Sequence, residues 1–209
     1  MKKLTLIALI VCLAFNYAYA QRKIEYGFTL GGGLGIQHID NSSILNNNSV
    51  RTFNANIVVN IPVLDQYYLR TGLGLANKGT VITEDALTTT NKITYFEIPV
   101  LLARKYDVPT LGKIIAGVGG YAAMGSSGTL TYETPNSNTS NNVTFGNEND
   151  FKKYDAGLSL LAGLALNNRL TFNLGYDFGL SNIASQPLKD SDYKSVYNRE
   201  FTITLGLIF

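Results

Sequence analysis

Apolar and polar side chains alternate with a period of two along most of the chain, which is typical of β-strands. The last segment, residues 199–209, places bulky apolar side chains on one face and mostly small or polar ones on the other. Segments at 25–37, 154–166 and 170–181 repeat this pattern, and weaker examples lie at 50–61, 67–78, 92–106 and 111–124. The sequence therefore predicts an all-β fold with eight strands.

The connections between these segments alternate in length. Short ones lie near 62–66, 107–110 and 167–168, and long ones near 39–49, 79–91, 125–150 and 182–198. Bacterial outer-membrane barrels have short periplasmic turns and long extracellular loops. We therefore expect an eight-stranded antiparallel up-and-down transmembrane β-barrel in the bacterial outer membrane. Both termini would be periplasmic, and the Asn-, Ser- and Thr-rich loops would be extracellular, solvated and mobile.

A soluble, lipocalin-like ligand-binding barrel also has eight strands, but its apolar face points inward. Here the polar face is small and Gly-rich, whereas the apolar face is bulky and carries aromatic residues near the strand ends. Such residues are typical of two interfacial girdles. One predicted girdle contains Tyr26, Phe28, Tyr67, Tyr106 and Phe209, and the other contains Phe53, Phe96, Tyr154 and Phe201. This pattern favours the membrane barrel.

The interior of an eight-stranded barrel is just wide enough to be filled by side chains. Parity places several large apolar residues on the inward face. They are Leu101, Ile115, Tyr121 and Leu161. We therefore expect a structural or accessory component of the cell envelope, not an open general porin.

Residues 1–20 have the pattern of a cleaved secretory signal peptide. Lys2 and Lys3 precede an uncharged apolar run at 4–15, and Ala18-Tyr19-Ala20 has the small-x-small pattern of a cleavage site. The run is too short for a membrane-spanning helix. The expected organisation is a signal peptide at 1–20 and one barrel domain at 21–209.

Charge and cysteine content exclude several functions. Residues 1–20 hold two of the 17 basic residues, none of the 15 acidic ones and the only cysteine, so the predicted mature chain has no net charge. It offers no basic surface for nucleic acid. It also offers no disulfide or thiolate ligand, and no His/Asp cluster has metal-ligand spacing. We expect no cofactor, no metal and no nucleic-acid partner.

Parity also places charged side chains in the narrow interior, where an unpaired charge is costly. We expect them to form a structural network in which Arg70 pairs with Glu97 on the adjacent strand. Glu25 and Glu200 lie nearer strand ends, where they can remain hydrated. The other predicted members of this network are Lys113, Asp155 and Asp177.

His38 is the only histidine, and it supports an alternative function. A lipid-modifying outer-membrane enzyme needs a base beside a nucleophilic serine. Ser42 and Ser43 follow His38, and Asp40 is a candidate orienting acid. A solvated loop histidine is the simpler interpretation of so local a cluster, and we expect no enzymatic activity.

Two further features have structural interpretations. The glycine-rich run at 31–35 lacks the glycine at position 36 that a nucleotide-binding loop requires, and it fits close packing in a narrow barrel. Pro99 lies inside a strand pattern, where it removes a ladder hydrogen bond and predicts a local bulge.

Three stretches carry a family resemblance. The run Tyr95–Leu102, YFEIPVLL, resembles the Y-x-E-I-P-L-L signature of the PorT-like outer-membrane β-barrel family common in Bacteroidetes. The runs Tyr154–Gly163 and Tyr176–Ile183 resemble that family's D-x-G…G-x-G…Y-x-x-G-L-x-N-I ending. The resemblance implies an outer-membrane barrel. One named member serves a gliding-associated secretion system, so the resemblance also implies envelope or secretion-system proteins as partners.

The end of the chain points to two further partners. Phe209 terminates an alternating last strand, which resembles the C-terminal signal read by the outer-membrane insertion machinery. We therefore expect this machinery and outer-membrane lipid to contact the protein.

Overall fold

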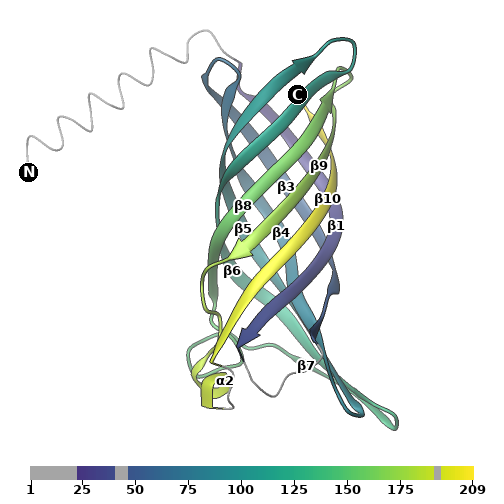
Figure 1. Cartoon of the computed structure of the whole chain (residues 1–209). Helices are drawn as coiled ribbons and strands as arrows, with labels where there is room; N and C mark the ends of the chain where they lie inside the picture. Colours follow the sequence, from purple (N-terminus) through teal and green to yellow (C-terminus); the bar gives the residue numbers. More distant parts are fainter. Residues whose placement is uncertain (1–22, 41–46, 191–193) are drawn as a thin grey trace, which may run out of the picture.

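The computed structural model describes residues 23–40, 47–190 and 194–209, which form an antiparallel β-barrel (Figure 1). The predicted signal peptide at 1–20 lies outside these residues. No helix within the described ranges is long and apolar enough to span a membrane. The strands that form the wall are β1 (Glu25–Asp40), β3 (Val50–Leu64), β4 (Tyr67–Glu84), β5 (Leu87–Val108), β6 (Gly112–Thr134), β8 (Tyr154–Leu166), β9 (Leu170–Gly179) and β10 (Ser195–Ile208).

These eight strands form a closed ring. Each pairs antiparallel with the wall strand that follows it in the chain, and β1 pairs with β10 to close the barrel. The short strands β2 (Asn47–Asn48) and β7 (Ser137–Asn142) add to β4 and β6 at one end, and the five-residue helix α2 (Gln186–Asp190) lies at the same end (Figure 1). The predicted eight-stranded antiparallel up-and-down barrel is confirmed.

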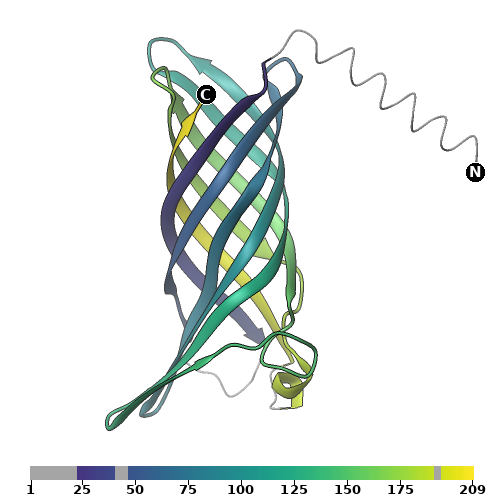
Figure 2. The same ribbon diagram turned by 180° about the vertical axis from the view of Figure 1, so that it is seen from behind.

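Two of the expected loops are instead β-hairpins. Strands β4 and β5 continue to a two-residue turn at Asp85 and Ala86, and β6 joins β7 through Pro135 and Asn136. The hairpins extend beyond the barrel at the end opposite the C-terminus (Figures 1 and 2). These segments are polar but rich in threonine and other β-formers, so they continue the sheet although they lack an apolar face.

The bulky apolar side chains face outward along the whole wall. Ile57 and Ile203 are 64% and 55% exposed, whereas Tyr95 on the inner face is fully buried. Most residues of the two predicted aromatic girdles lie on this outer face, each with more than a third of its side chain exposed. They are Tyr26, Phe28, Tyr106, Phe209, Phe53, Phe96, Tyr154 and Phe201. An apolar exterior around a polar interior is the reverse of a soluble ligand-binding barrel, and it excludes that alternative.

The glycine-rich run lies in β1, where two backbones approach closely. A Cβ atom on Gly31 would lie 2.0 Å from the carbonyl oxygen of Ile203, and one on Gly33 would lie 1.8 Å from that of Phe201. Only glycine fits at these positions against β10. The run therefore serves the closure of the barrel.

The bulge predicted at Pro99 is absent from the described wall. The β4–β5 ladder keeps one register on both sides of Pro99, and pairing is interrupted only around this residue. Thr71 Oγ1 donates a hydrogen bond to the Pro99 carbonyl at 2.8 Å, which satisfies an acceptor where the ladder is broken. The register shift in β5 lies instead between Thr94 and Tyr95, opposite β6.

The outward face generates a stability prediction. Ile203→Arg places a charge in the apolar band and should destabilise the barrel by about 2–4 kcal/mol, the cost of arginine near the bilayer midplane. Asn136→Arg, at an exposed hairpin turn, should change stability by less than about 0.5 kcal/mol. Urea unfolding in lipid vesicles measures both. Equal effects of the two substitutions would contradict a lipid-facing position for Ile203.

Candidate functional site

Lys78 of β4 is the centre of a charge cluster inside the barrel. Its Nζ atom lies 2.6 Å from Glu97 Oε2, 3.4 Å from Asp177 Oδ2 and 3.9 Å from Asp155 Oδ2, and its side chain is fully buried. The acids come from β5, β8 and β9. One ammonium group therefore joins opposite sides of the wall across the lumen.

Aromatic and amide side chains complete this Lys78 cluster. The Lys78 Nζ atom lies 3.5 Å from the centre of the Tyr121 ring, a cation–π contact. The Tyr121 hydroxyl donates to Asp155 Oδ2 at 3.1 Å, and Asn198 Nδ2 donates to the same oxygen at 2.9 Å. Asn198 also donates to the Tyr95 hydroxyl at 3.3 Å. These bonds hold the buried carboxylate in one orientation.

A second cluster lies nearer the chain termini. Glu25 contacts Lys105 Nζ and accepts a hydrogen bond from Asn60 Nδ2 at 2.9 Å. Arg70 Nη1 donates to Asn60 Oδ1 at 3.4 Å, and Lys105 Nζ lies 4.1 Å from the centre of the Tyr68 ring. This Glu25 cluster contains more basic than acidic groups, whereas the Lys78 cluster contains more acidic ones.

The predicted pair between Arg70 and Glu97 was wrong. Glu97 lies opposite Gly74 in the β4–β5 ladder, four residues from both Arg70 and Lys78. Arg70 lies directly opposite Asn60, which in turn lies opposite Glu25. Arg70 therefore belongs to the Glu25 cluster, and Glu97 binds Lys78.

Two other predicted positions also differ. Lys113 is not part of the buried network, because it lies at the start of β6 with a half-exposed side chain and binds the exposed Asp107 at 2.9 Å. Glu200 was expected to remain hydrated but is only 1% exposed, and its Oε1 atom accepts a hydrogen bond from Asn54 Nδ2 at 2.7 Å. β10 begins at Ser195, so Glu200 lies within the strand rather than at its end.

Lys78 and Lys105 were missing from the predicted network although their parity matches that of Arg70 and Glu97. The alternating pattern ends at Lys78 and so predicts a solvated loop after it, whereas β4 continues to Glu84. The continuation of polar, threonine-rich segments as strand was the signal that would have found it.

A layer of amides and an apolar plug cover the Lys78 cluster. Asn91 Nδ2 donates to Gln37 Oε1 at 2.9 Å, and Gln37 Nε2 donates to Asn198 Oδ1 at 3.0 Å. The apolar plug packs beside this layer and draws on the connections before β8 and before β10. Its buried residues are Ile93, Tyr95, Tyr121, Ala123, Val143, Phe151, Ile183, Ala184 and Val196.

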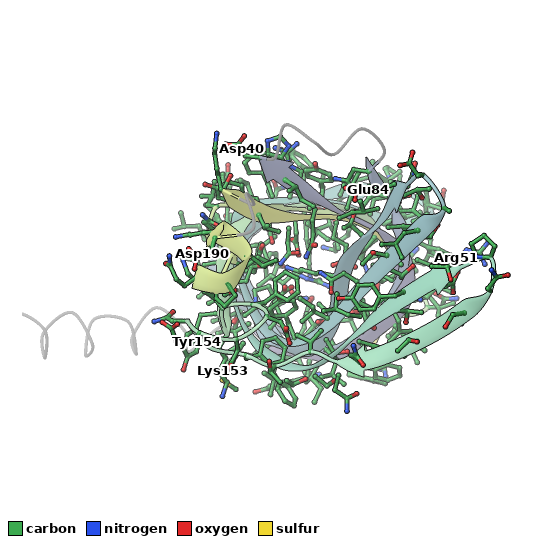
Figure 3. All side chains as sticks on the ribbon, turned by 90° about the horizontal axis from the view of Figure 1, so that it is seen from below. Asp40, Arg51, Glu84, Lys153, Tyr154 and Asp190 are labelled. Carbon is green, nitrogen blue, oxygen red and sulfur yellow. The ribbon has the colours of Figure 1, made fainter. Side chains whose placement is uncertain are left out.

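Backbone hydrogen bonds fix the two connections that supply the plug. Lys152 N donates to Ile183 O at 2.9 Å, and Ile183 N donates to Val196 O at 2.9 Å. Figure 3 views the barrel from this end, and side chains occupy the space inside the ring. The described parts of these connections are therefore packed structure rather than the mobile loops expected from composition.

The void that remains between the two clusters is small. It has a volume of about 100 Å³ and is lined by both Arg70 and Glu97, together with polar residues that include Asn54, Ser159 and Asn173. A polar cavity of this size holds a few water molecules. It separates the cluster with excess positive charge from the one with excess negative charge.

The family-like motifs supply the Lys78 cluster. Glu97 belongs to the YFEIPVLL run, Asp155 opens the D-x-G run, and Asp177 follows Tyr176 in the last motif. A Cβ atom on Gly157, the glycine of D-x-G, would lie 2.8 Å from Tyr121 Cε1. The Phe178 carbonyl oxygen would lie closer still, at 2.2 Å, so this glycine permits the close approach of β9 as well as of the tyrosine ring that covers Lys78.

His38 lies on the exposed outer side of β1, and Asp40 is exposed at the end of the same strand. The candidate nucleophiles Ser42 and Ser43 lie outside the described residues. Within the described ranges no group of three or more histidine, cysteine, aspartate or glutamate residues is arranged to hold a metal ion.

Replacing Lys78 tests the charge cluster. Lys78→Met leaves buried carboxylates without a counter-charge and should destabilise the barrel by about 3–5 kcal/mol. Lys113→Met removes an exposed pair and should cost less than about 1 kcal/mol. Urea unfolding at neutral pH measures the difference, and the loss in Lys78→Met should shrink at acidic pH, where neutral acids need no counter-charge. Equal stability of both variants would show that Lys78 is dispensable.

Known proteins resemble this chain at the level of family and fold. A search of curated proteins found no match. Neisserial surface protein A aligns with 10% identity and a TM-score of 0.51 over 90% of this chain and 100% of its own. Ail, the attachment invasion locus protein of Yersinia pestis, aligns with 12% identity and a TM-score of 0.42 over 90% and 100% of the two chains. The outer membrane protein beta-barrel domain family matches residues 19–185, and the chain belongs to this family of bacterial outer-membrane barrels.

Proposed function

We propose that this protein is a closed, non-enzymatic barrel that serves the cell envelope as a structural or accessory component and does not act as an open porin. The observation that carries the proposal is that side chains block the middle of the lumen, with larger cavities of about 370 and 420 Å³ only towards its two ends. The Glu25 cluster, the Lys78 cluster and the apolar plug occupy successive levels from the terminal end to the hairpin end.

The charges in the lumen favour stability over transport. A permeation pathway needs groups that a solute can leave as easily as it enters. The acids around Lys78 already bind its ammonium group, and Tyr121 covers it. Moving these groups aside would break buried ion pairs at a cost of several kcal/mol.

We further propose that both termini are periplasmic and that the hairpins lie outside the cell. The turns at the terminal end are short, such as Asp65-Gln66 and residues 167–169, whereas the long hairpins and α2 lie at the other end (Figure 1). This asymmetry is the usual one in bacterial barrels.

The C-terminal strand supports the proposed contact with the insertion machinery. Phe209 is 53% exposed on the outer face. Its backbone N–H donates to Tyr26 O at 2.7 Å and its carbonyl accepts from Tyr26 N at 3.2 Å. The end of the chain thus lies at the seam where β1 and β10 close the barrel.

A PorT-like role in protein secretion is the finer form of this proposal. It rests on the motifs that include Glu97, Asp155 and Asp177, and on a filled lumen that leaves the exterior and the hairpins as the surfaces available to partners. A strain that lacks the gene should then accumulate secreted proteins in the periplasm, and the wild-type gene should restore export.

The first prediction from this proposal concerns conductance. Purified protein in a planar bilayer should show little or no current, because an eight-stranded lumen filled by side chains has no continuous water path. A porin prepared in the same detergent serves as the positive control. Large and stable openings of the wild-type protein would disprove the closed barrel.

The second prediction concerns orientation. The only cysteine is Cys12, in the predicted signal peptide, so single cysteines can be introduced into the barrel domain. Asn136→Cys at a hairpin turn should react with a membrane-impermeant maleimide on intact cells. Asn167→Cys at a short turn should react only after the outer membrane is permeabilised. The reverse pattern would place the termini outside the cell.

A further inference from the structure

We propose that the outer wall of the barrel binds a phospholipid in the leaflet at the terminal end, with Arg104 on the lipid phosphate and an acyl chain in an adjoining groove. This inference rests on insertion of the barrel into the membrane and on the proposed periplasmic position of the terminal end. It does not depend on the closed lumen or on a role in secretion.

The groove exists because small residues interrupt the bulky outer face. Arg104 of β5 lies opposite Ala116 of β6, Ala116 lies opposite Ala162 of β8, and Ala162 lies opposite Leu174 of β9. The two alanines leave a depression of about 530 Å³ across these strands. Its remaining lining is almost entirely apolar and includes Leu102, Val118, Leu160, Tyr176 and Phe201.

Arg104 is the only charged residue in the lining of this groove, and it lies beside the terminal rim. Its guanidinium donates to the Gln66 Oε1 atom at 3.2 Å and to the Tyr67 hydroxyl at 3.4 Å. It lies 4.5 Å from the centre of the Tyr106 ring and 5.2 Å from that of Tyr67. The side chain is thus held by neutral groups and directed toward the turn between β3 and β4.

The positive charge of Arg104 has no acidic partner among the described residues. Its hydrogen-bond acceptors are a tyrosine on Nη1 and a glutamine on Nη2, so each terminal nitrogen keeps a second N–H for another acceptor. Lys78 and Lys105 on the inner face, by contrast, bind carboxylates. An arginine left with unused donors at this position is suited to an anion from outside the chain.

Phospholipid matches both halves of the site. A guanidinium group binds phosphate through two parallel hydrogen bonds. Tyrosines such as Tyr67 and Tyr106 favour the level of lipid headgroups. An apolar groove that begins at the same arginine receives the chain attached to that phosphate. A soluble anion would use Arg104 and leave the groove empty.

Native mass spectrometry of the delipidated protein in detergent tests the proposal, with phosphatidylglycerol as the added lipid. One molecule should be retained preferentially by the wild-type protein. Arg104→Gln should weaken its binding by about tenfold or more, as expected for the loss of a charge-assisted interaction. Ala162→Phe should weaken binding similarly by filling the groove, and it probes the site without altering the arginine.

Two controls make the outcome decisive. Arg169→Gln removes another arginine that stacks on an aromatic ring, Phe209, but that does not line the groove, and it should leave binding unchanged. Diacylglycerol, which lacks the phosphate, should bind the wild-type protein at least about tenfold more weakly. Heat-modifiable migration in gels verifies that each variant is folded.

Three results would overturn the proposal. They are undiminished binding in both Arg104→Gln and Ala162→Phe, equal binding of diacylglycerol and phosphatidylglycerol, and preferential binding of lipopolysaccharide, which would assign the site to the other leaflet. A conducting channel would disprove the closed lumen and would leave this lipid site untouched.

Discussion

The interior of this barrel depends on the neutralisation of one buried charge. Lys78 is fully buried, and its ammonium group contacts acids from three other strands. Burying an isolated charge at such a position costs several kcal/mol of folding free energy. Carboxylates, an aromatic face and hydrogen bonds offset this cost only when every partner is in place. Because the partners come from β5, β8 and β9, satisfying Lys78 requires the ring to be closed at the correct diameter and register. The charge therefore favours a single closed arrangement over alternative pairings of eight similar strands.

This requirement gives the family-like motifs a physical meaning. The three acids of these motifs are separated by tens of residues in the chain, yet all of them meet at one lysine. The glycines that accompany them make space: a Cβ atom on Gly157 would lie 2.8 Å from Tyr121 Cε1, and one on Gly179 would lie 3.2 Å from the Tyr121 hydroxyl oxygen. Acid and glycine thus act together, because the carboxylate needs the tyrosine as a hydrogen-bond donor and the tyrosine needs the glycines to fit in the lumen. Ile183, at the end of the last motif, is fully buried in the plug above.

The sequence alone predicted the wall better than its contents. A period of two determines which face of a strand a residue occupies, so the strand number, the outward aromatic residues and the inward acids followed from pattern. Which charged side chains pair inside the lumen depends on their position along the barrel axis, and the alternation of inward and outward residues does not predict that position. Glu97 lies midway between Arg70 and Lys78 in the ladder, and only the neighbouring strands decide between them. Hairpin lengths were missed for a related reason. In the hairpins that extend beyond the barrel, both faces of a strand are solvated or packed on polar groups, so the alternation that marks a strand is lost.

The arrangement of charge along the axis follows from filling a narrow lumen with polar groups. The terminal end holds Arg70 and Lys105 with one contacting acid, Glu25, and the middle holds Lys78 with several acids. Each level alone is unbalanced, and the small polar cavity that both Arg70 and Glu97 line lies between them. Opposite imbalances at neighbouring levels attract one another across this cavity. The charged groups of the interior therefore serve to hold the strands of the wall together. The outer face around Arg104 and the hairpins are then the surfaces left for the lipid and protein contacts that we propose.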